Sequence, residues 1–148
     1  MGLTLVDTGV IVGFLDADDA LHGPAHEAFE TRMRAGAFFC ASAVTYAELL
    51  TGVELGHHDA TVVHGFLDGL SIGVLPVDDA VAEEAARIRG GQRDGRSRSR
   101  RARLQMPDAL ILATAATVPG VDEVVVADRD WVGIDVGVDI HHLRPPAS

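Results

Sequence analysis

Short apolar runs alternate with longer segments of helical periodicity along most of this 148-residue chain. The runs cover residues 3–6 (LTLV), 37–42 (AFFCAS), 71–77 (SIGVLPV), 122–128 (DEVVVAD) and, as a possible fifth, 138–143 (VDIHHL). Strands that are apolar throughout, rather than at every second position, are typical of a parallel sheet covered on both faces. We therefore expect an α/β fold with three α/β/α layers, in which helices flank a mostly parallel sheet of four to five strands.

The segments around these strands carry the signals of helices. Residues 22–36 space their apolar side chains as a helix does and end at a glycine. DALILATAATV is apolar on all sides, as in a buried central helix. With no repeat and no long linker, residues 1–148 are expected to form a single domain. The expected helices begin after Asp7, at residue 22, after Ser42, at residue 58, after Asp78 or Asp79, and near Pro107.

Four acidic residues lie in or directly beside apolar runs, where acids are uncommon. Asp7 follows LTLV, Glu48 lies within SAVTYAELLTGV, Asp108 opens DALILATAA, and Asp128 follows VVVA. A buried carboxylate without a partner costs several kcal/mol, so such groups are normally paired or bound to a cation. The chain has no lysine, and no arginine flanks Asp7, Glu48 or Asp108. A divalent cation is therefore the partner that we expect.

The expected topology allows these acids to meet. In open parallel sheets, ligands bind beyond the carboxyl ends of strands where the strand order reverses, and Asp7 and Asp128 both end a predicted strand. Carboxylate oxygens suit Mg²⁺ or Mn²⁺, which activate water for attack on phosphorus. We predict a metal-dependent hydrolase whose catalytic, metal-binding residues are Asp7, Glu48, Asp108 and Asp128. Glu48 could also orient the water.

Each acid also has an explanation that needs no metal. Asp7 could simply terminate a strand, and Glu48 could face solvent. Asp108 is favoured by the helix dipole in a first turn in any case. Asp128 and Asp130, both in ADRDW, could each form an Asx-turn. The joint pattern favours the metal site over these separate explanations.

Charge is segregated along the chain. The net charge is −10, yet all 12 basic residues are arginine, and eight of them fall between residues 87 and 103. Such a distribution suits a protein that holds cations in one place and phosphates in another.

No apolar run approaches 18 residues, so no membrane-spanning helix is expected. The acid within the N-terminal apolar stretch argues against a secretory signal, and the single Cys40, expected to be buried, fits a reducing compartment. We expect a cytoplasmic protein.

The motifs resemble those of PIN-domain nucleases, and in particular the VapC toxins of bacterial toxin–antitoxin pairs. LVDTGVIVGFL is similar to the family's opening strand followed by Asp and Thr or Ser, and ASAVTYAELLTGV is similar to the second motif. MPDALILATAA resembles the third motif, the most specific one, and VVVADRDW resembles the fourth. The similarity runs in order from residue 3 to about residue 143.

The resemblance implies a PIN-like fold and an endoribonuclease that depends on Mg²⁺ or Mn²⁺. It also implies a homodimer, and inhibition by a cognate VapB-like antitoxin whose tail fills the active site. Thr8 would be a hydroxyl neighbour of the first acid. One position departs from the family pattern: the threonine expected two residues before the fourth acid is Val126 here. Asp130 could therefore replace Asp128 as the fourth ligand.

The arginine-rich segment before the third motif is the predicted contact to the RNA substrate. Each phosphate that it neutralises adds affinity without reading sequence. The alternative is a solvated loop, which is compatible with ordering on binding. The predicted RNA-binding residues are Arg93, Arg96, Arg98, Arg100, Arg101 and Arg103.

Two other functions fit parts of the sequence. LVDTGV contains the Asp-Thr-Gly of retroviral-type aspartic proteases, but those enzymes are all-β, unlike the chain expected here. A PIN-like domain that binds RNA or protein without cleaving is the stronger alternative. Walker-type nucleotide hydrolysis and Schiff-base catalysis are excluded, because both need a lysine.

Overall fold

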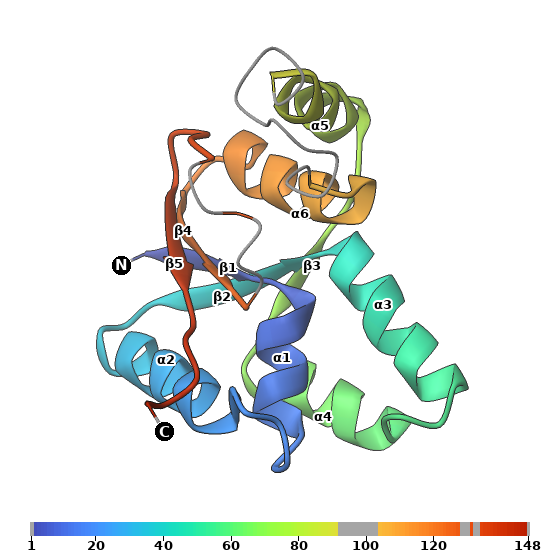
Figure 1. Cartoon of the computed structure of the whole chain (residues 1–148), viewed down its shortest axis with the longest axis vertical. Helices are drawn as coiled ribbons and strands as arrows, with labels where there is room; N and C mark the ends of the chain where they lie inside the picture. The colour runs from blue at the N-terminus through green and yellow to red at the C-terminus, as the bar shows by residue number, and fades with distance from the viewer. Residues whose placement is uncertain (1, 92–103, 128–130, 132–133, 148) are drawn as a thin grey trace.

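The computed structural model describes residues 2–91, 104–127, 131 and 134–147. Within these residues the sheet has five strands in the order β3-β2-β1-β4-β5, and every neighbouring pair is parallel. Helices cover both faces of the sheet (Figure 1), which confirms the predicted three-layer α/β/α fold. The strands are β1 (Leu3–Val6), β2 (Phe38–Ser42), β3 (Gly73–Leu75), β4 (Val121–Val126) and β5 (Asp139–His142).

The described helices agree with the predicted ones. Helices α1, α2 and α4 lie on one face of the sheet and α5 and α6 on the other, whereas α3 extends from the carboxyl end of β2 (Figure 1). The bounds are α1 (Thr8–Leu15), α2 (His22–Arg34), α3 (Ala43–Glu54), α4 (Ala60–Gly69), α5 (Asp79–Gly91) and α6 (Met106–Thr117).

Polar caps and glycines set several of these boundaries. Ser42 Oγ accepts from Val44 N at 3.1 Å and so caps α3. Asp78, rather than Asp79, caps α5, since its Oδ1 accepts from Val81 N at 3.0 Å. Gly36, at φ 79°, follows α2 in the left-handed conformation that glycine adopts without strain. These are the residues from which the helix boundaries were predicted.

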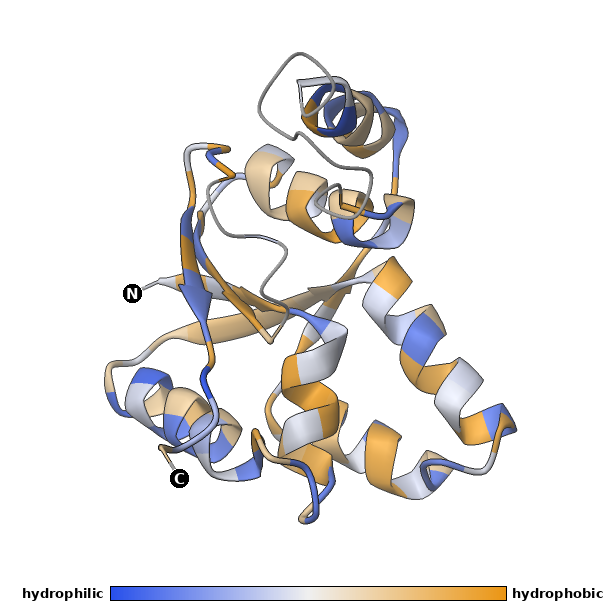
Figure 2. Cartoon of the chain, in the orientation of Figure 1, coloured by the Kyte–Doolittle hydropathy of each residue, from blue (hydrophilic) through white to orange (hydrophobic). Residues whose placement is uncertain are grey.

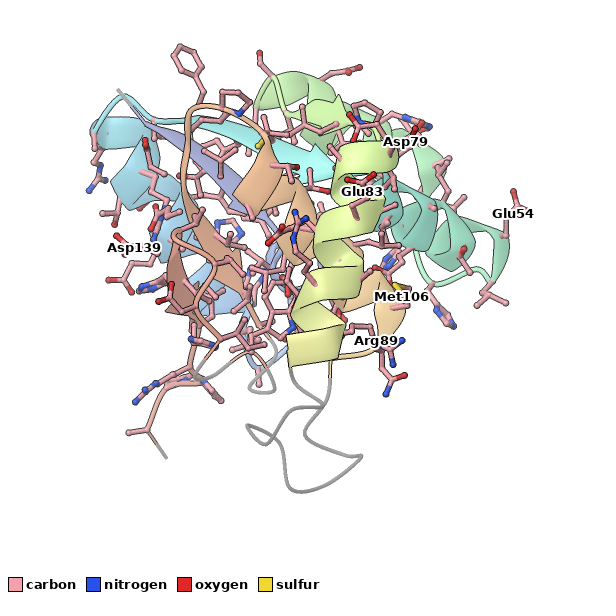
Figure 3. All side chains as sticks on the ribbon, turned by 90° about the horizontal axis from the view of Figure 1, so that it is seen from above. Glu54, Asp79, Glu83, Arg89, Met106 and Asp139 are labelled. Atoms are coloured by element: carbon pink, nitrogen blue, oxygen red, sulfur yellow. The ribbon has the colours of Figure 1, made fainter. Side chains whose placement is uncertain are left out.

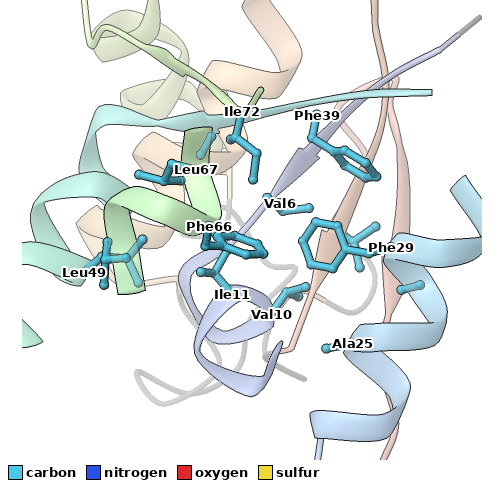
Figure 4. Close-up of a cluster of buried hydrophobic side chains, with 14 of the residues drawn as sticks. Val6, Val10, Ile11, Ala25, Phe29, Phe39, Leu49, Phe66, Leu67 and Ile72 are labelled. Atoms are coloured by element: carbon cyan, nitrogen blue, oxygen red, sulfur yellow. The ribbon is translucent and has the colours of Figure 1, made fainter. Parts of the chain in front are cut away.

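Two apolar cores lie on opposite faces of the sheet. The core beneath α1, α2 and α4 contains Phe29, Phe39 and Phe66 (Figure 4). The other core lies beneath α6 and contains Leu112 and Trp131, both fully buried. Figure 2 shows hydrophobic residues on α1, α6 and the inner strands of the sheet, whereas the edge strand β5 is largely hydrophilic. The alternation of apolar runs and amphipathic helices thus accounts for the layers.

Helix α5 forms an additional outer layer over α6. It packs through Val81, Ala85 and Ile88 into the second core, while Asp79 and Glu83 are exposed on its outer side (Figure 3). Because α6 is covered by the sheet on one side and by α5 on the other, nearly all of its positions are apolar, as predicted.

The strand order reverses beside β1. The chain proceeds from β1 to β2 and β3 on one side, and β4 and β5 are added on the other side. The carboxyl ends of β1 and β4 therefore flank a topological switch point, the usual ligand site of an open parallel sheet. None of the described helices has the length and apolar character needed to cross a membrane.

Candidate active site

Asp7 connects three parts of the fold at the carboxyl end of β1. Its backbone N–H donates to Val125 O at 3.1 Å, which ties it to β4. Its side chain caps α1, since Oδ1 accepts from Val10 N at 2.9 Å. The other oxygen, Oδ2, accepts from Ala127 N at 3.2 Å. With only 5% of its surface exposed, the carboxylate is held in one orientation by two amides.

Glu48 reaches the same region from the second turn of α3. Its Oε1 accepts a hydrogen bond from Thr8 Oγ1 at 2.7 Å, which joins α3 to the first residue of α1. The Thr8 hydroxyl also lies 3.2 Å from that of Thr45, one turn before Glu48. Glu48 is an exposed residue, unlike Asp7. Thr8, which the family resemblance implied as a hydroxyl neighbour of the first acid, is therefore hydrogen-bonded to the second.

Asp108 lies in the first turn of α6, directly after Pro107. It is half-buried, and the positive end of the helix dipole favours a carboxylate at this position. Ile111, one turn later, is 1% exposed and fixes this end of α6 against the core. The acid is thus carried by one of the most deeply buried helices of the fold.

The three acids line one pocket of about 280 Å³. They come from positions 7, 48 and 108 and from three different elements, and none of the described lining residues is basic. The fold therefore brings Asp7, Glu48 and Asp108 together at the switch point, while their catalytic role stays a prediction. The lining residues are Asp7, Thr8, Gly9, Glu48, Asp108, Ile111 and Ala127.

Gly9 allows α1 to approach the end of β4. A Cβ at this position would lie 2.8 Å from Ala127 Cβ and 3.8 Å from Asp7 Oδ1. The first distance is shorter than real Cβ contacts, so the lack of a side chain permits the Asp7–Ala127 hydrogen bond.

Three residues of the site, Gly9, Ala127 and Thr45, were not among the predicted site residues. The glycine after Asp-Thr and the threonine three positions before Glu48 are the signals that identify two of them.

The donor set suits a hard cation that keeps part of its water. Mg²⁺ and Mn²⁺ prefer carboxylate oxygens, and Mg²⁺ commonly retains several waters. Within the described residues, no three side chains of the His, Cys, Asp and Glu types lie close enough together to hold an ion. A carboxylate oxygen has two lone pairs, so an oxygen that accepts one hydrogen bond can also bind a cation. The pocket acids therefore fit a cation whose coordination is completed by other oxygens, including water.

The predicted fourth acid lies outside the described residues, as does its alternative. Asp128 and Asp130 fall in residues 128–130, which the structure does not describe. Ala127, the residue before Asp128, lines the pocket. Val126, where the family pattern has threonine, is fully buried at the end of β4.

The arginine-rich segment is also outside the described residues, which stop at Gly91 and resume at Leu104. The described residues on the two sides of this segment are linked, because Arg89 Nε donates to Leu104 O at 3.1 Å. Leu104 is buried and lies two residues before α6. Figure 3 shows Arg89 and Met106 at the same end of α5. The predicted contacts are Arg93, Arg96, Arg98, Arg100, Arg101 and Arg103, all within the part that is not described.

Comparisons with known proteins agree with this geometry. The family model "PIN domain" matches residues 4–135. Among solved structures, a chain of VapBC2 from Rickettsia felis bound to promoter DNA aligns with a TM-score of 0.73 at 12% identity, covering 96% of this chain and 99% of that chain. A search of curated proteins gave no significant match.

Two further similar structures come from Mycobacterium tuberculosis. The VapBC-5 toxin–antitoxin structure aligns at 25% identity with a TM-score of 0.55, covering 97% of this chain and 99% of that chain. VapC20, a toxin that cleaves the sarcin-ricin loop, aligns at 21% identity with a TM-score of 0.61, covering 90% and 97%. Since the family model spans most of the sequence, and the three described acids gather where the strand order reverses, this chain belongs to the PIN domain family.

Proposed function

We propose that this chain is a divalent-metal-dependent endoribonuclease and the toxin of a toxin–antitoxin pair. The observation that carries the proposal is the pocket at the switch point that Asp7, Glu48 and Asp108 line from three different elements. A cation bound in this pocket, with water and further oxygens completing its coordination, would offset the negative charge of its lining. Membership of the PIN domain family supports the same chemistry.

The pocket acids would hold the metal together. Asp7, Glu48 and Asp108 would bind Mg²⁺ or Mn²⁺, with Asp128 or Asp130 as the fourth acid. A bound ion would neutralise phosphate charge and would lower the pKa of a coordinated water. Glu48, whose Oε1 is engaged by Thr8, would use Oε2 to orient water for attack. Hydrolysis would then form a bond from the water oxygen to phosphorus, and a ribose oxygen would leave with a proton.

The arginine-rich segment would bind the RNA backbone next to this pocket. Its last arginine, Arg103, precedes the buried Leu104, and Asp108 follows four residues later. This closeness along the chain would supply positive charge beside an acidic pocket, which would otherwise repel a polyanion. The contacts would be to phosphates, so they would raise affinity without choosing a sequence.

Cleavage of RNA by purified protein tests the proposal. A 5′-labelled structured RNA is incubated with the wild-type chain in Mg²⁺ or in EDTA, beside Asp108→Asn and Asp7→Asn. We expect cleavage in Mg²⁺ alone, reduced roughly 100-fold or more in both variants, as when a stabiliser of transition-state charge is lost. Asp59→Asn is the control, because exposed Asp59 caps α4 outside the pocket.

The outcomes separate the candidate functions. Equal cleavage by all proteins, or cleavage that persists in EDTA, would exclude the metal mechanism. Binding of RNA without cleavage by any of them would favour the PIN-like binding module.

The partners follow from the same proposal. Solved neighbours are toxin–antitoxin assemblies, and we propose a VapB-like antitoxin and a homodimer for this chain as well. Coexpression with the product of the gene immediately upstream, followed by light scattering of the purified complex, tests both partners. Failure to copurify, or a monomer at micromolar concentration, would contradict this part.

A further inference from the structure

The structure assigns a positioning role to Thr45: we propose that its buried hydroxyl, acting through Thr8, holds the Glu48 carboxylate in the pocket. The inference rests on the proposed function, since it gives Glu48 a task there. Thr45 has no exposed surface, which is uncommon for a polar side chain. Its hydroxyl lies 3.2 Å from Thr8 Oγ1, which lies 2.7 Å from Glu48 Oε1.

Proton counting gives this chain of hydrogen bonds a direction. A carboxylate only accepts, so the single hydroxyl proton of Thr8 is donated to Glu48. The Thr8 oxygen then accepts the proton of Thr45. With Thr45 as donor, the Thr8 hydroxyl keeps its proton directed toward Glu48, and hydrogen bonds in such a chain strengthen one another.

Thr45 differs from three other helical threonines in where its hydroxyl bonds. Thr51, Thr114 and Thr117 each donate to the carbonyl four residues earlier in their own helix. For Thr45, in the first turn of α3, the residue four positions earlier is Ala41 of β2. Ala41 precedes the helix, so its carbonyl does not offer Thr45 the acceptor that a helical residue four positions earlier would. The Thr45 hydroxyl pairs instead with Thr8 of α1.

Glu48 needs such support because it is exposed. A glutamate on a helix surface loses about 1–2 kcal/mol of rotamer entropy when it is fixed. The Thr8 bond holds Oε1 and leaves Oε2 for a cation or its water. Thr45 and Glu48 are one turn apart on α3, while Thr8 lies on α1. The three groups therefore also fix α3 against the helix that Asp7 caps.

Binding of Mn²⁺ to the purified full chain, without RNA, tests this role. The dissociation constant is measured by titration with detection of free Mn²⁺ by electron paramagnetic resonance. Thr45→Val, nearly isosteric, is expected to raise the constant about threefold to tenfold, the effect of one lost hydrogen bond. Thr45→Ser keeps the hydroxyl and is expected to restore binding to within about twofold of the wild type.

Two further proteins separate positioning from a general loss of stability. Thr117→Val is the control, since Thr117 is a partly buried helical threonine that donates within α6; it is expected to change Mn²⁺ affinity less than about twofold. In a Glu48→Ala background, Thr45→Val is expected to have no further effect, because the group that it positions is absent.

The Mn²⁺ titrations separate the positioning role of Thr45 from a general loss of stability and from the nuclease proposal. An equal loss from Thr45→Val with and without Glu48, or no loss at all, would overturn the inference, and so would a wild-type chain that binds no Mn²⁺. If the chain binds Mn²⁺ with the expected pattern yet cleaves no RNA, the nuclease proposal fails while the role of Thr45 stands.

Discussion

Asp7 Oδ2 accepts a hydrogen bond from the backbone amide of Ala127, 120 residues later in the chain. The same carboxylate caps α1 through Val10 N. One buried side chain thus links the ends of β1 and β4 to the start of α1. A residue predicted to bind metal therefore also has a structural function, and substitutions at this position affect stability as well as activity.

Asp7→Asn is expected to destabilise the protein although it preserves the shape of the side chain. Both oxygens of Asp7 accept from amides, whereas asparagine has one acceptor and one donor. In either orientation its NH₂ group would face an N–H, so we expect a loss of about 1–3 kcal/mol in the free energy of unfolding. The substitution also removes the repulsion of Asp7 by Glu48 and Asp108, which should raise the free energy of unfolding by about 1 kcal/mol or less in a pocket open to water.

Urea unfolding at pH 7 measures this loss, with Asp59→Asn as the control. Asp59 also caps a helix, but among the described residues it accepts through Oδ1 alone, from Thr61 N at 2.7 Å. Asparagine is an equally good cap there, and both substitutions remove one charge from a helix N-terminus. If Asp7→Asn is no less stable than Asp59→Asn, the second hydrogen bond of Asp7 contributes nothing.

Gly9→Ala is expected to lower stability by about 1–3 kcal/mol, the usual effect of overpacking. The new Cβ would lie 2.8 Å from Ala127 Cβ, so α1 and the end of β4 would have to separate. At the exposed position Gly65 of α4, an added Cβ would meet nothing within 4 Å. Gly65→Ala should therefore stabilise the protein by about 0.5–1 kcal/mol through the higher helix propensity of alanine. Thermal unfolding of both proteins should give shifts of opposite sign, and shifts of equal sign would contradict the close contact.

The fold was largely predictable because its signals are local. Apolar runs identified the strands, and caps such as Ser42 and Asp78 identified where helices begin. The order of the strands has no local signal, yet it decides that Asp7 and the end of β4 lie together. Convergence of the acids was inferred from the rule that ligands bind at switch points, rather than from any contact visible in the sequence.

The connections within the site were less predictable, because they join distant positions. The Thr8–Glu48 bond spans 40 residues, and the Arg32–Glu123 ion pair, outside the site, spans 91. The partner of Asp7 at Ala127 is a backbone amide, which every residue except proline has, so its side chain gives no sign of it. Exposed Glu48 also shows that an acid in an apolar segment need not be buried.

Cys40 is expected to be unreactive in the folded protein. It is 2% exposed on β2, and burial raises the pKa of its thiol to about 12. The thiolate is the reactive form, so at pH 8 almost none is present, and modification requires unfolding. Ellman's reagent should therefore label the thiol slowly in buffer and rapidly in 6 M guanidinium, a concentration chosen to unfold most domains of this size (~5 M or less at the midpoint). Rapid labelling of the native chain would contradict this burial.

The ion pair of Arg32 and Glu123 should make stability depend on pH. Burial raises the pKa of the Glu123 carboxyl, but hydrogen bonds and charge from Arg32, with contributions from Thr4 and His141, lower it overall below 4.5. A carboxyl whose pKa is lower in the folded state stabilises the protein above its unfolded pKa, and this stability is lost as pH falls through the folded pKa.

Glu123→Gln should therefore lower the free energy of unfolding by about 1–2 kcal/mol at pH 7 and by progressively less below about pH 4. Urea unfolding across this range measures the difference, and Glu30→Gln, whose exposed pair with Arg34 is 3.7 Å long, should change stability by less than about 0.5 kcal/mol. A cost for Glu123→Gln that is the same at pH 3 and pH 7 would show that the charge of Glu123 does not contribute.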